Sequence, residues 1–178
     1  MTSLILNSNK ALQSILYIAE KISVKDFHKI FKILYFADRE HLSKYGRPIT
    51  GDTYFKMPKG PVPTKIYDIL KDIKKGQDYI FEESASFAKK LSIEGRCSVV
   101  PRKKADLDYL SESDVEELDA AISTYGELSF EALTELSHGP AWTSAKDNRA
   151  ISIKDILKES GQEEDYIAYV CESLASYI

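Results

Sequence analysis

The sequence is poor in the residues from which metal and nucleophilic sites are usually built. It has three histidines and two cysteines among 178 residues, and Cys97 and Cys171 are far apart, outside any CxxC motif. Since zinc sites in proteins need three or four clustered ligands, we expect no metal and no cofactor. Two reduced thiols in a cytoplasmic protein are the simplest interpretation of the cysteines, although spacing alone leaves a disulfide open.

Long apolar runs and a basic surplus are also missing. No run approaches the roughly 18 residues of a membrane-spanning helix, and the start MTSLILNSNKALQ lacks the basic and apolar regions of a signal peptide. The net charge is −4, whereas nucleic-acid binding favours a strong positive charge. We therefore expect a cytoplasmic protein with no membrane partner, for which nucleic acid is a disfavoured partner.

What is present suits an ordinary globular chain. Hydrophobic residues make up 43% and charged residues 29% of the sequence, and this length is enough to bury a core without disulfides or metals. We predict a mainly α fold of the α+β type: a single compact helical domain over residues 1–178. It would have six to seven helices with a small β-hairpin or short-strand insertion.

Apolar residues at helical spacing locate the helices. The predicted helices cover residues 8–22, 23–44, 61–76, 111–126 and 129–138, with a short turn at Trp142, a brief helix over 152–157 and a last helix beginning near Gln162. Ser23, Ser111, Ser129 and Ser152 are the predicted N-caps. Gly46 is suited to a left-handed C-cap before Pro48, and Gly76 ends the third helix.

Two segments favour extended structure. Residues 49–57 carry a β-favouring mixture and predict a short strand or an extended crossing. Residues 91–100 predict a hairpin turning near Gly95, followed by Pro101 and a basic run that suit an edge strand.

Residues 34–67 are the part of the chain that says most about function, yet they contain no nucleophile–base pair of the kind found in active sites. The segment Gly60-Pro61-Val62-Pro63 is not a phosphate loop, because it lacks the second glycine and Thr64-Lys65 reverses the required order. Two interpretations can hold together: a rigid opening of the next helix, or part of a surface that binds a partner. We expect no enzymatic activity.

Several motifs, in this order and spacing, resemble one known family. They are Leu34-Tyr35-Phe36-Ala37-Asp38, residues 45–52 (YGRPITGD), Gly60-Pro61-Val62, residues 125–129 (YGELS) with Leu133, Leu136-Ser137-His138 and Ala141-Trp142. Together, over roughly residues 10–160, they resemble the Panacea antitoxin domain family, also called SocA-like. Any one of these motifs is weak by itself, and their specificity comes from the combination.

The resemblance implies an antitoxin of a bacterial or phage toxin–antitoxin system, a phage-associated protein that neutralises a cognate protein toxin by direct binding. One alternative is an adaptor that delivers the toxin to a Clp-type protease; a DNA-binding regulator or an uncharacterised enzyme is another, and a homo-oligomer stays open. The residues we predict to bind the partner are Tyr45, Asp52, Tyr54, Phe55, Met57, Gly60, Pro61 and Val62. Those we predict to be structural are Tyr35, Asp38, Gly46, Pro48, His138 and Trp142.

Individual polar residues have simpler structural explanations. Asp38 lies on an apolar helix and should have an internal partner, near Arg39 or at Arg47, because an unpaired buried carboxylate is costly. Asp52 is expected to cap local amides in a turn. His138 is expected to pack and bond to the backbone.

The charges are segregated along the chain. Residues 106–119 carry seven acids and no base, and residues 89–104 carry six bases and one acid. These runs are either solvated faces that lie opposite each other or, for the acidic helix, a surface that steers a basic toxin.

Overall fold

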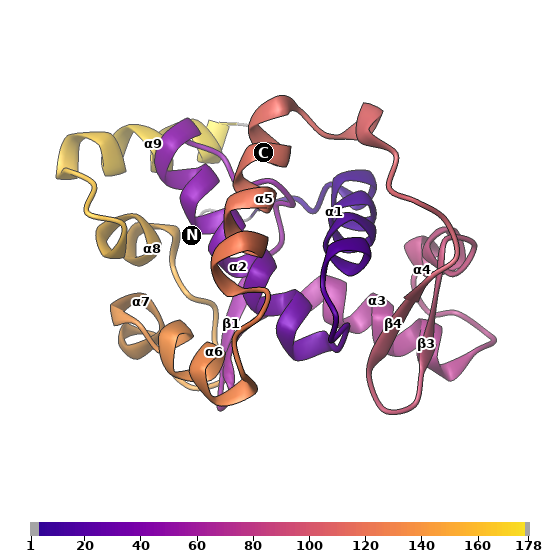
Figure 1. Ribbon diagram of the computed structural model, residues 1–178. Helices are drawn as coiled ribbons and strands as arrows, with labels where there is room; N and C mark the ends of the chain where they lie inside the picture. Colours follow the sequence, from indigo (N-terminus) through magenta and orange to yellow (C-terminus); the bar gives the residue numbers. More distant parts are fainter. Residues whose placement is uncertain (1–3, 177–178) are drawn as a thin grey trace.

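The computed structural model describes residues 4–176 and shows a mainly helical protein with two small β-hairpins (Figure 1). The predicted mainly α fold with a β insertion is confirmed, and the described residues form nine α-helices rather than six or seven. The helices are α1 (Ser8–Lys21), α2 (Phe27–Tyr45), α3 (Thr64–Lys75), α4 (Glu82–Ala88), α5 (Glu112–Tyr125), α6 (Phe130–Ser137), α7 (Pro140–Ser144), α8 (Ile153–Glu159) and α9 (Glu164–Ser176). The strands are β1 (Tyr54–Met57), β2 (Gly60–Pro63), β3 (Leu91–Glu94) and β4 (Ser98–Pro101), and one 3₁₀ turn covers Leu107–Tyr109.

Helix α2 is the centre of the fold. Fourteen of its 19 residues are buried, as expected for a helix that is apolar on two faces. In Figure 1 it runs through the middle of the molecule, with α5 in front, α1 on one side and α8 and α9 on the other. Its aromatic side chains pack on neighbours from several elements; the rings of Phe36 and Tyr125 stack at 3.9 Å between centroids.

The ends of the first two helices are set by local capping. Asn7 caps α1 by accepting from the Lys10 amide at 3.0 Å. The prediction that Ser23 caps the second helix is wrong, because Asp26 accepts from the Lys29 amide at 2.8 Å and α2 begins one residue later. The predicted C-cap is confirmed: Gly46 is left-handed, with φ of 72°.

The segment Gly60–Pro63 is a strand, not the first turn of a helix as predicted. It pairs antiparallel with β1, Tyr54 opposite Pro63 and Met57 opposite Gly60, and α3 begins only at Thr64. The other edge of β1 is also occupied, since the Lys56 amide donates to the Arg149 carbonyl and the Ile151 amide to the Tyr54 carbonyl. Strand β1 is therefore hydrogen-bonded along both of its edges. Helix α3 ends at Gly76, which is in the left-handed conformation as predicted.

The second hairpin turns at Gly95 as predicted, with β3 and β4 antiparallel. Its outer edge at β4 is not free, however, because the Val99 amide donates to the Lys25 carbonyl and the Phe27 amide to the Cys97 carbonyl. The sequence missed α4, a helix of seven residues in which only Ser84 and Phe87 are buried. Such a short apolar pattern is too weak to predict a helix.

The C-terminal half follows its predicted caps closely. Ser111 and Asp114 form a capping box, and Ser129 and Ser152 accept from the amides of the third residue on, Ala132 and Asp155. The short α7 carries Trp142, and α9 begins at Glu164, two residues after the predicted start. Both cysteines are free.

Candidate partner-binding surface

Strand β2 is attached to α2 by a buried lysine. Lys32 on α2 is 1% exposed, and its Nζ donates to the Pro61 carbonyl at 2.9 Å. This bond satisfies a carbonyl that the hairpin does not use internally. Burial lowers the pKa of Lys32 to about 7, so the surroundings disfavour its charged form.

Gly60 lies directly over Lys32, and only glycine fits there. Its φ is 101°, and a Cβ at this position would lie 2.2 Å from Ser137 Oγ and 2.6 Å from Lys32 Cε. The close approach brings β2 against the end of α6, where Ser137 is buried. The Gly-Pro-Val motif is thus a packing junction between the hairpin, α2 and α6.

Two histidine–aromatic stacks stand beside this hairpin. The rings of His138 and Trp142 stack at 3.7 Å and 10°, and those of His28 and Phe130 at 3.8 Å and 25°. The indole of Trp142 also donates to the Met57 carbonyl at 3.1 Å, which ties α7 to the end of β1. The end of the hairpin is therefore attached to α7 as well as to α2.

The pKa values of the two stacked histidines are lowered, which favours their neutral forms. Burial, with the nearby Lys32 charge, lowers the pKa of His28 to about 4, and the same two causes lower the pKa of His138. Near neutral pH the stacks are consequently uncharged aromatic pairs. Two lysines remain beside them: Lys59 is exposed at the turn, and Lys56 Nζ lies 4.5 Å from the Trp142 ring centroid.

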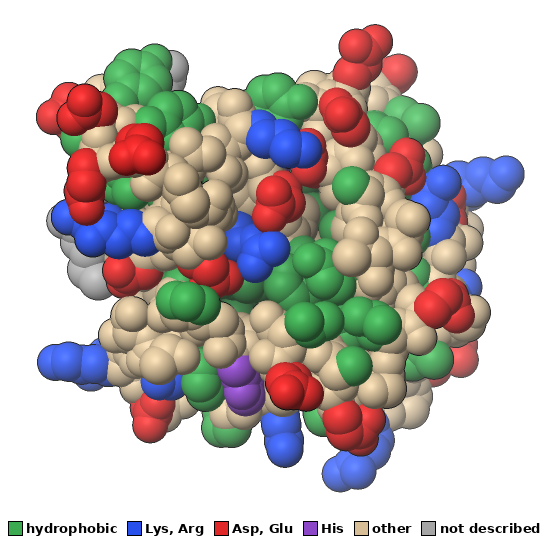
Figure 2. All heavy atoms as spheres, turned by 60° about the vertical axis from the view of Figure 1, so that its left-hand side comes forward, with side chains coloured by type: hydrophobic (Ala, Val, Ile, Leu, Met, Phe, Trp, Pro, Cys, Tyr) green, Lys and Arg blue, Asp and Glu red, His purple; other side chains and the backbone are tan. Residues whose placement is uncertain are grey.

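We call this region the hairpin-tip surface, and it consists of His28, Met57, Pro58, Lys59, Phe130, His138 and Trp142. Phe130 is 43% exposed and Pro58 is also exposed, while Met57 and Trp142 are half-buried. Figure 2 shows the side of the molecule that carries α7 and α8; near its lower edge a histidine lies between hydrophobic and charged side chains. The surface combines aromatic area with a polar margin, as protein interfaces do.

The residues predicted to bind a partner divide into two groups by burial. Asp52, Tyr54, Gly60 and Pro61 are buried and lie beneath the surface, so they support it rather than present themselves on it. Phe55, Met57 and Val62 are half-buried, and Tyr45 is 47% exposed but belongs to the far end of α2. His28 and Phe130 were not predicted, because only the fold brings them to the hairpin; Lys59 belongs to the turn between β1 and β2 and lies in the segment predicted to contribute to a partner surface.

Asp38 has an internal partner as predicted, but not an arginine. Its Oδ1 accepts from the Ile49 and Thr50 amides at 2.6 and 3.0 Å, and its Oδ2 accepts from the Thr50 and Tyr54 hydroxyls, both at 2.7 Å. Four donors thus compensate a carboxylate that is 4% exposed. The pKa of Asp38 is nonetheless raised, chiefly by burial.

Asp52 caps amides, as expected for a turn residue, and does so for a whole helix. It accepts from the Thr53 amide at 2.7 Å and from the Lys65 and Ile66 amides, at 3.2 and 2.8 Å, in the first turn of α3. Burial raises the pKa of Asp52 to about 6, against the effect of these hydrogen bonds. Asp38 and Asp52 together fix the extended segment that leads into the hairpin.

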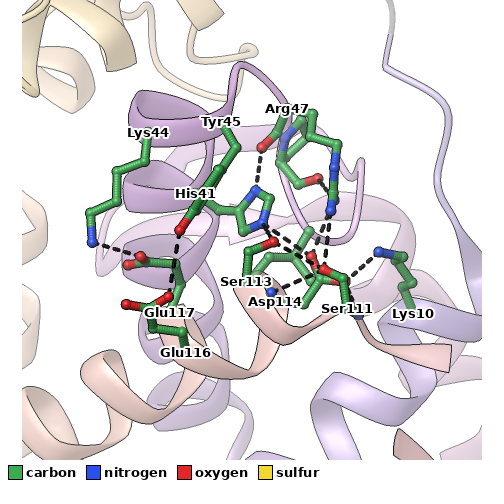
Figure 3. A network of polar contacts seen from close by, with 12 residues as sticks. Lys10, His41, Lys44, Tyr45, Arg47, Ser111, Ser113, Asp114, Glu116 and Glu117 are labelled. Carbon is green, nitrogen blue, oxygen red and sulfur yellow. Dashed lines mark hydrogen bonds and ion pairs between the residues drawn. The ribbon is translucent and has the colours of Figure 1, made fainter. Parts of the chain in front are cut away.

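A third carboxylate, Asp114, locks α5 onto α1 and α2 (Figure 3). Its side chain is fully buried and contacts Lys10 Nζ, Arg47 Nη1 at 3.1 Å and His41 Nε2 at 3.2 Å. Burial alone would raise the pKa of Asp114, but bonds from His41 and Lys10 outweigh it and hold the pKa well below its usual range. Arg47 therefore pairs with Asp114 rather than with Asp38.

Comparison with known proteins identifies the family. A family model described as antitoxin SocA-like, Panacea domain, matches residues 30–143, which is more than half of the chain. The chain belongs to this family. A search of curated proteins gave no significant match, and neither did a search of solved structures.

The matched part of the Panacea domain contains α2 from Ile30 onward, α3, α4, both hairpins, α5, α6 and the start of α7. It therefore includes every residue of the hairpin-tip surface except His28. In the described part of the chain, no three His, Cys, Asp or Glu side chains come together as a metal site. Within residues 4–176 no helix has the length and apolar character to cross a bilayer.

The acidic run of the Panacea domain is paired with its own helices rather than with the basic hairpin. Glu117 accepts from Lys44 at 2.6 Å, Asp119 lies 3.7 Å from Lys21, and Asp114 has the contacts given above. None of the ion pairs among residues 4–176 joins residues 89–104 to this helix. No ion pair among these residues therefore supports the interpretation that the two charged runs face each other.

Proposed function

We propose that this Panacea protein is an antitoxin that neutralises a cognate protein toxin by binding it at the hairpin-tip surface. Membership of the antitoxin-like family supports a protein partner. The observation that carries the location is the hairpin turn held beside two histidine–aromatic stacks, with Phe130 and Pro58 open to solvent. No catalytic step is required, because occupying the toxin's surface is enough.

Rigidity favours binding at this place. The hairpin is attached to α2 through Lys32 and to α7 through Trp142, and residues 148–151 cover the other edge of β1. A surface that is already ordered loses little conformational entropy when a partner binds. Aromatic side chains at such surfaces commonly supply most of the binding free energy.

The charges on the hairpin-tip surface indicate which kind of toxin surface it would bind. Near neutral pH the two histidines are mostly uncharged. Of the two lysines beside the stacks, Lys56 lies 3.4 Å from Asp147, and Lys59 is exposed at the turn. An apolar toxin patch with acidic groups at its margin would complement this arrangement.

The test is co-expression with the product of the neighbouring gene, scored by rescue of growth and by co-purification. Phe130→Ser should weaken complex formation at least tenfold, the scale of a hot-spot aromatic. Tyr109→Ser is the matched control, since Tyr109 is an aromatic of similar exposure, 46%, on the 3₁₀ turn. Equal affinity of the two variants would reject the hairpin-tip surface, and failure of the wild type to rescue or co-purify would reject the antitoxin function.

An adaptor that delivers the toxin to a Clp-type protease is the second candidate, and it needs another free surface. Tyr169 on α9 is 66% exposed, and in Figure 1 α9 lies at the opposite end of the molecule from α6 and the hairpin. Toxin half-life in strains with and without the protease separates the functions. Under the adaptor hypothesis the toxin disappears faster when this chain is present and Tyr169→Ser slows that loss, whereas sequestration leaves the half-life unchanged or longer.

A further inference from the structure

The chain between β4 and α5 carries both signs of charge in a fixed order. Residues 102–112 read RKKADLDYLSE, and we call this stretch segment 102–112. Three exposed cations come first and three exposed acids follow: Arg102, Lys103 and Lys104, then Asp106, Asp108 and Glu112. In Figure 1 the segment leads from β4, on the right, up to the start of α5, away from α7 and α8 on the left.

These six charged side chains are not neutralised inside one chain. None of them forms an ion pair with any residue among 4–176. Arg102 Nη1 donates only to the Ala88 carbonyl, at 3.1 Å, and Asp106 Oδ1 accepts from the nearby Asp108 amide, also at 3.1 Å. Both halves of the segment therefore present unpaired charge to the solvent.

Two large apolar side chains are exposed in the same segment. Leu107 is 50% and Tyr109 46% exposed, and both lie on the 3₁₀ turn. Exposed apolar groups surrounded by charged ones are typical of surfaces that bind protein. The segment thus has the composition of a small interface.

The backbone of the segment is attached to the body of the protein. The Ala105 amide donates to Glu20 of α1 at 2.6 Å. The Asp106 amide donates to Gln13, also of α1, at 2.8 Å. Ala105 itself packs against the hydrophobic core, so the charged residues on either side of it are directed outward from a fixed point. A segment ordered in this way loses little conformational entropy on binding.

We propose that segment 102–112 joins two copies of this chain in a two-fold symmetric dimer. A two-fold interface uses the same surface of both copies, so the two segments cross the symmetry axis in opposite directions. The cationic half of each segment then lies beside the acidic half of the other. Both sets of unpaired charges face opposite charges at once.

A second copy fits this segment better than a partner with one sign of charge. Nucleic acid would be attracted by the three cations but repelled by the three acids beside them, and a basic protein would meet the reverse. Another copy supplies both signs in the required order. With the axis near Ala105, Leu107 and Tyr109 face the lysine and arginine side chains of the other copy, whose carbon stems can cover apolar surface.

The dimer should be weak and sensitive to salt. The segment supplies eleven residues per chain, about half of the roughly 20–30 in a standard interface. We expect a dissociation constant between about 1 µM and 1 mM, in the range of transient complexes. Added salt should weaken the dimer, because it screens exposed charges.

Exchange of charges between the two halves tests the arrangement. One variant carries Arg102→Glu and Lys103→Glu, and the other carries Asp108→Lys and Glu112→Lys. Each variant alone should self-associate at least about 100-fold more weakly than wild type, because like charges then face each other. An equimolar mixture should form a 1:1 heterodimer of about wild-type affinity, since both contacts regain opposite charges. Sedimentation velocity from about 10 µM to about 1 mM protein at low salt measures all three.

Two further variants separate the interface from effects on folding. A chain with all four exchanges should dimerise with itself again, which an unfolded chain cannot do. Lys146→Glu with Arg149→Glu is the matched control, because these exposed cations lie outside the segment, and it should leave the dimer unchanged. If the exchanges prevent folding, Lys104→Cys gives a second measurement: under mild oxidation it should form a disulfide-linked dimer near the axis, whereas Lys146→Cys should not.

A wild type that stays monomeric at about 1 mM and low salt would overturn the proposal, whether or not it binds duplex DNA instead. So would a dimer that survives both exchanges, or a mixture of folded variants that stays monomeric. Open polymers in the mixture would also overturn it, because a two-fold interface closes on itself. Toxin affinity per chain should be the same for the monomeric variants as for wild type, since the segment lies away from α7 (Figure 1). The dimer and the proposed antitoxin function can therefore fail independently.

Discussion

The hydroxyl of Tyr54 donates a 2.7 Å hydrogen bond to Oδ2 of Asp38, and both side chains are buried. The bond joins β1 to α2 across 16 residues of sequence. Asp38 also holds Ile49 and Thr50, so this carboxylate connects the central helix to the whole extended segment before the hairpin.

Asp38→Ala should destabilise the protein by about 3 kcal/mol or more, because several buried donors lose their acceptor. Asp38→Asn should be nearly as harmful, since its NH₂ group faces donors. Tyr54→Phe removes a single bond and should cost about 1 kcal/mol. Urea unfolding measures all three, and a Tyr54→Phe cost equal to that of Asp38→Ala would contradict this division.

Gly60→Ala should destabilise the protein more than Gly76→Ala. Both glycines have positive φ, 101° and 89°, but only at Gly60 would a Cβ meet Ser137 and Lys32. The two variants share the backbone cost of about 1–2 kcal/mol, and the clash at Gly60 adds about 1–3 kcal/mol. Thermal or urea unfolding gives the comparison, and equal costs would mean that α6 moves away freely.

Lys32 should make stability rise with pH above neutrality. Its pKa is about 7 in the folded protein against an ordinary value of 10.5, so between these values the unfolded chain binds more protons. The free energy of unfolding should then increase by up to about 1.4 kcal/mol per pH unit from this group. Lys32→Met should flatten the profile between pH 7 and 10, and the same slope in both proteins would refute the assignment.

Asp114→Asn should be far more costly than Asp119→Asn on the same helix. The Asp114 side chain is fully buried and contacts Lys10, Arg47 and His41, whereas that of Asp119 is 51% exposed. We expect roughly 2–4 kcal/mol for the first, because its partners lose their counter-charge, and less than about 1 kcal/mol for the second. Chemical denaturation at pH 7 measures both.

The lowered pKa of Asp114 also has a pH consequence. Because the folded protein binds this proton less readily than the unfolded chain, the stabilisation is present at neutral pH and is lost as pH falls below the ordinary pKa range of a carboxyl. The difference in stability between wild type and Asp114→Asn should shrink in acid. A constant difference from pH 7 to pH 3 would argue that the hydrogen-bond geometry, not the charge, matters.

Features determined by neighbouring residues were predictable from the sequence. The caps Ser111, Ser129 and Ser152 were correct because each serine bonds to an amide three residues further on. The stops at Gly46 and Gly76 were correct because a left-handed residue favours glycine.

Features determined by distant pairing were not predictable in this way. Helix α2 is capped by Asp26 and not by Ser23, because the backbone of residues 25–27 pairs with β4 and α2 begins only after it. Gly60–Pro63 is a strand because β1 lies opposite, although its prolines also suit the start of a helix. Lys10 and Arg47 meet Asp114 from 104 and 67 residues away, a separation that no local pattern encodes.

Trp142 is the chain's only tryptophan, and it lies at the hairpin tip with its indole bonded to Met57 and stacked on His138. The intrinsic fluorescence of the unlabelled protein therefore comes, apart from tyrosine, from one place on the proposed interface. A toxin that covers this ring should change its emission wavelength or intensity. The protein thus carries a built-in optical reporter with which the binding site and the kinetics of complex formation can be followed together.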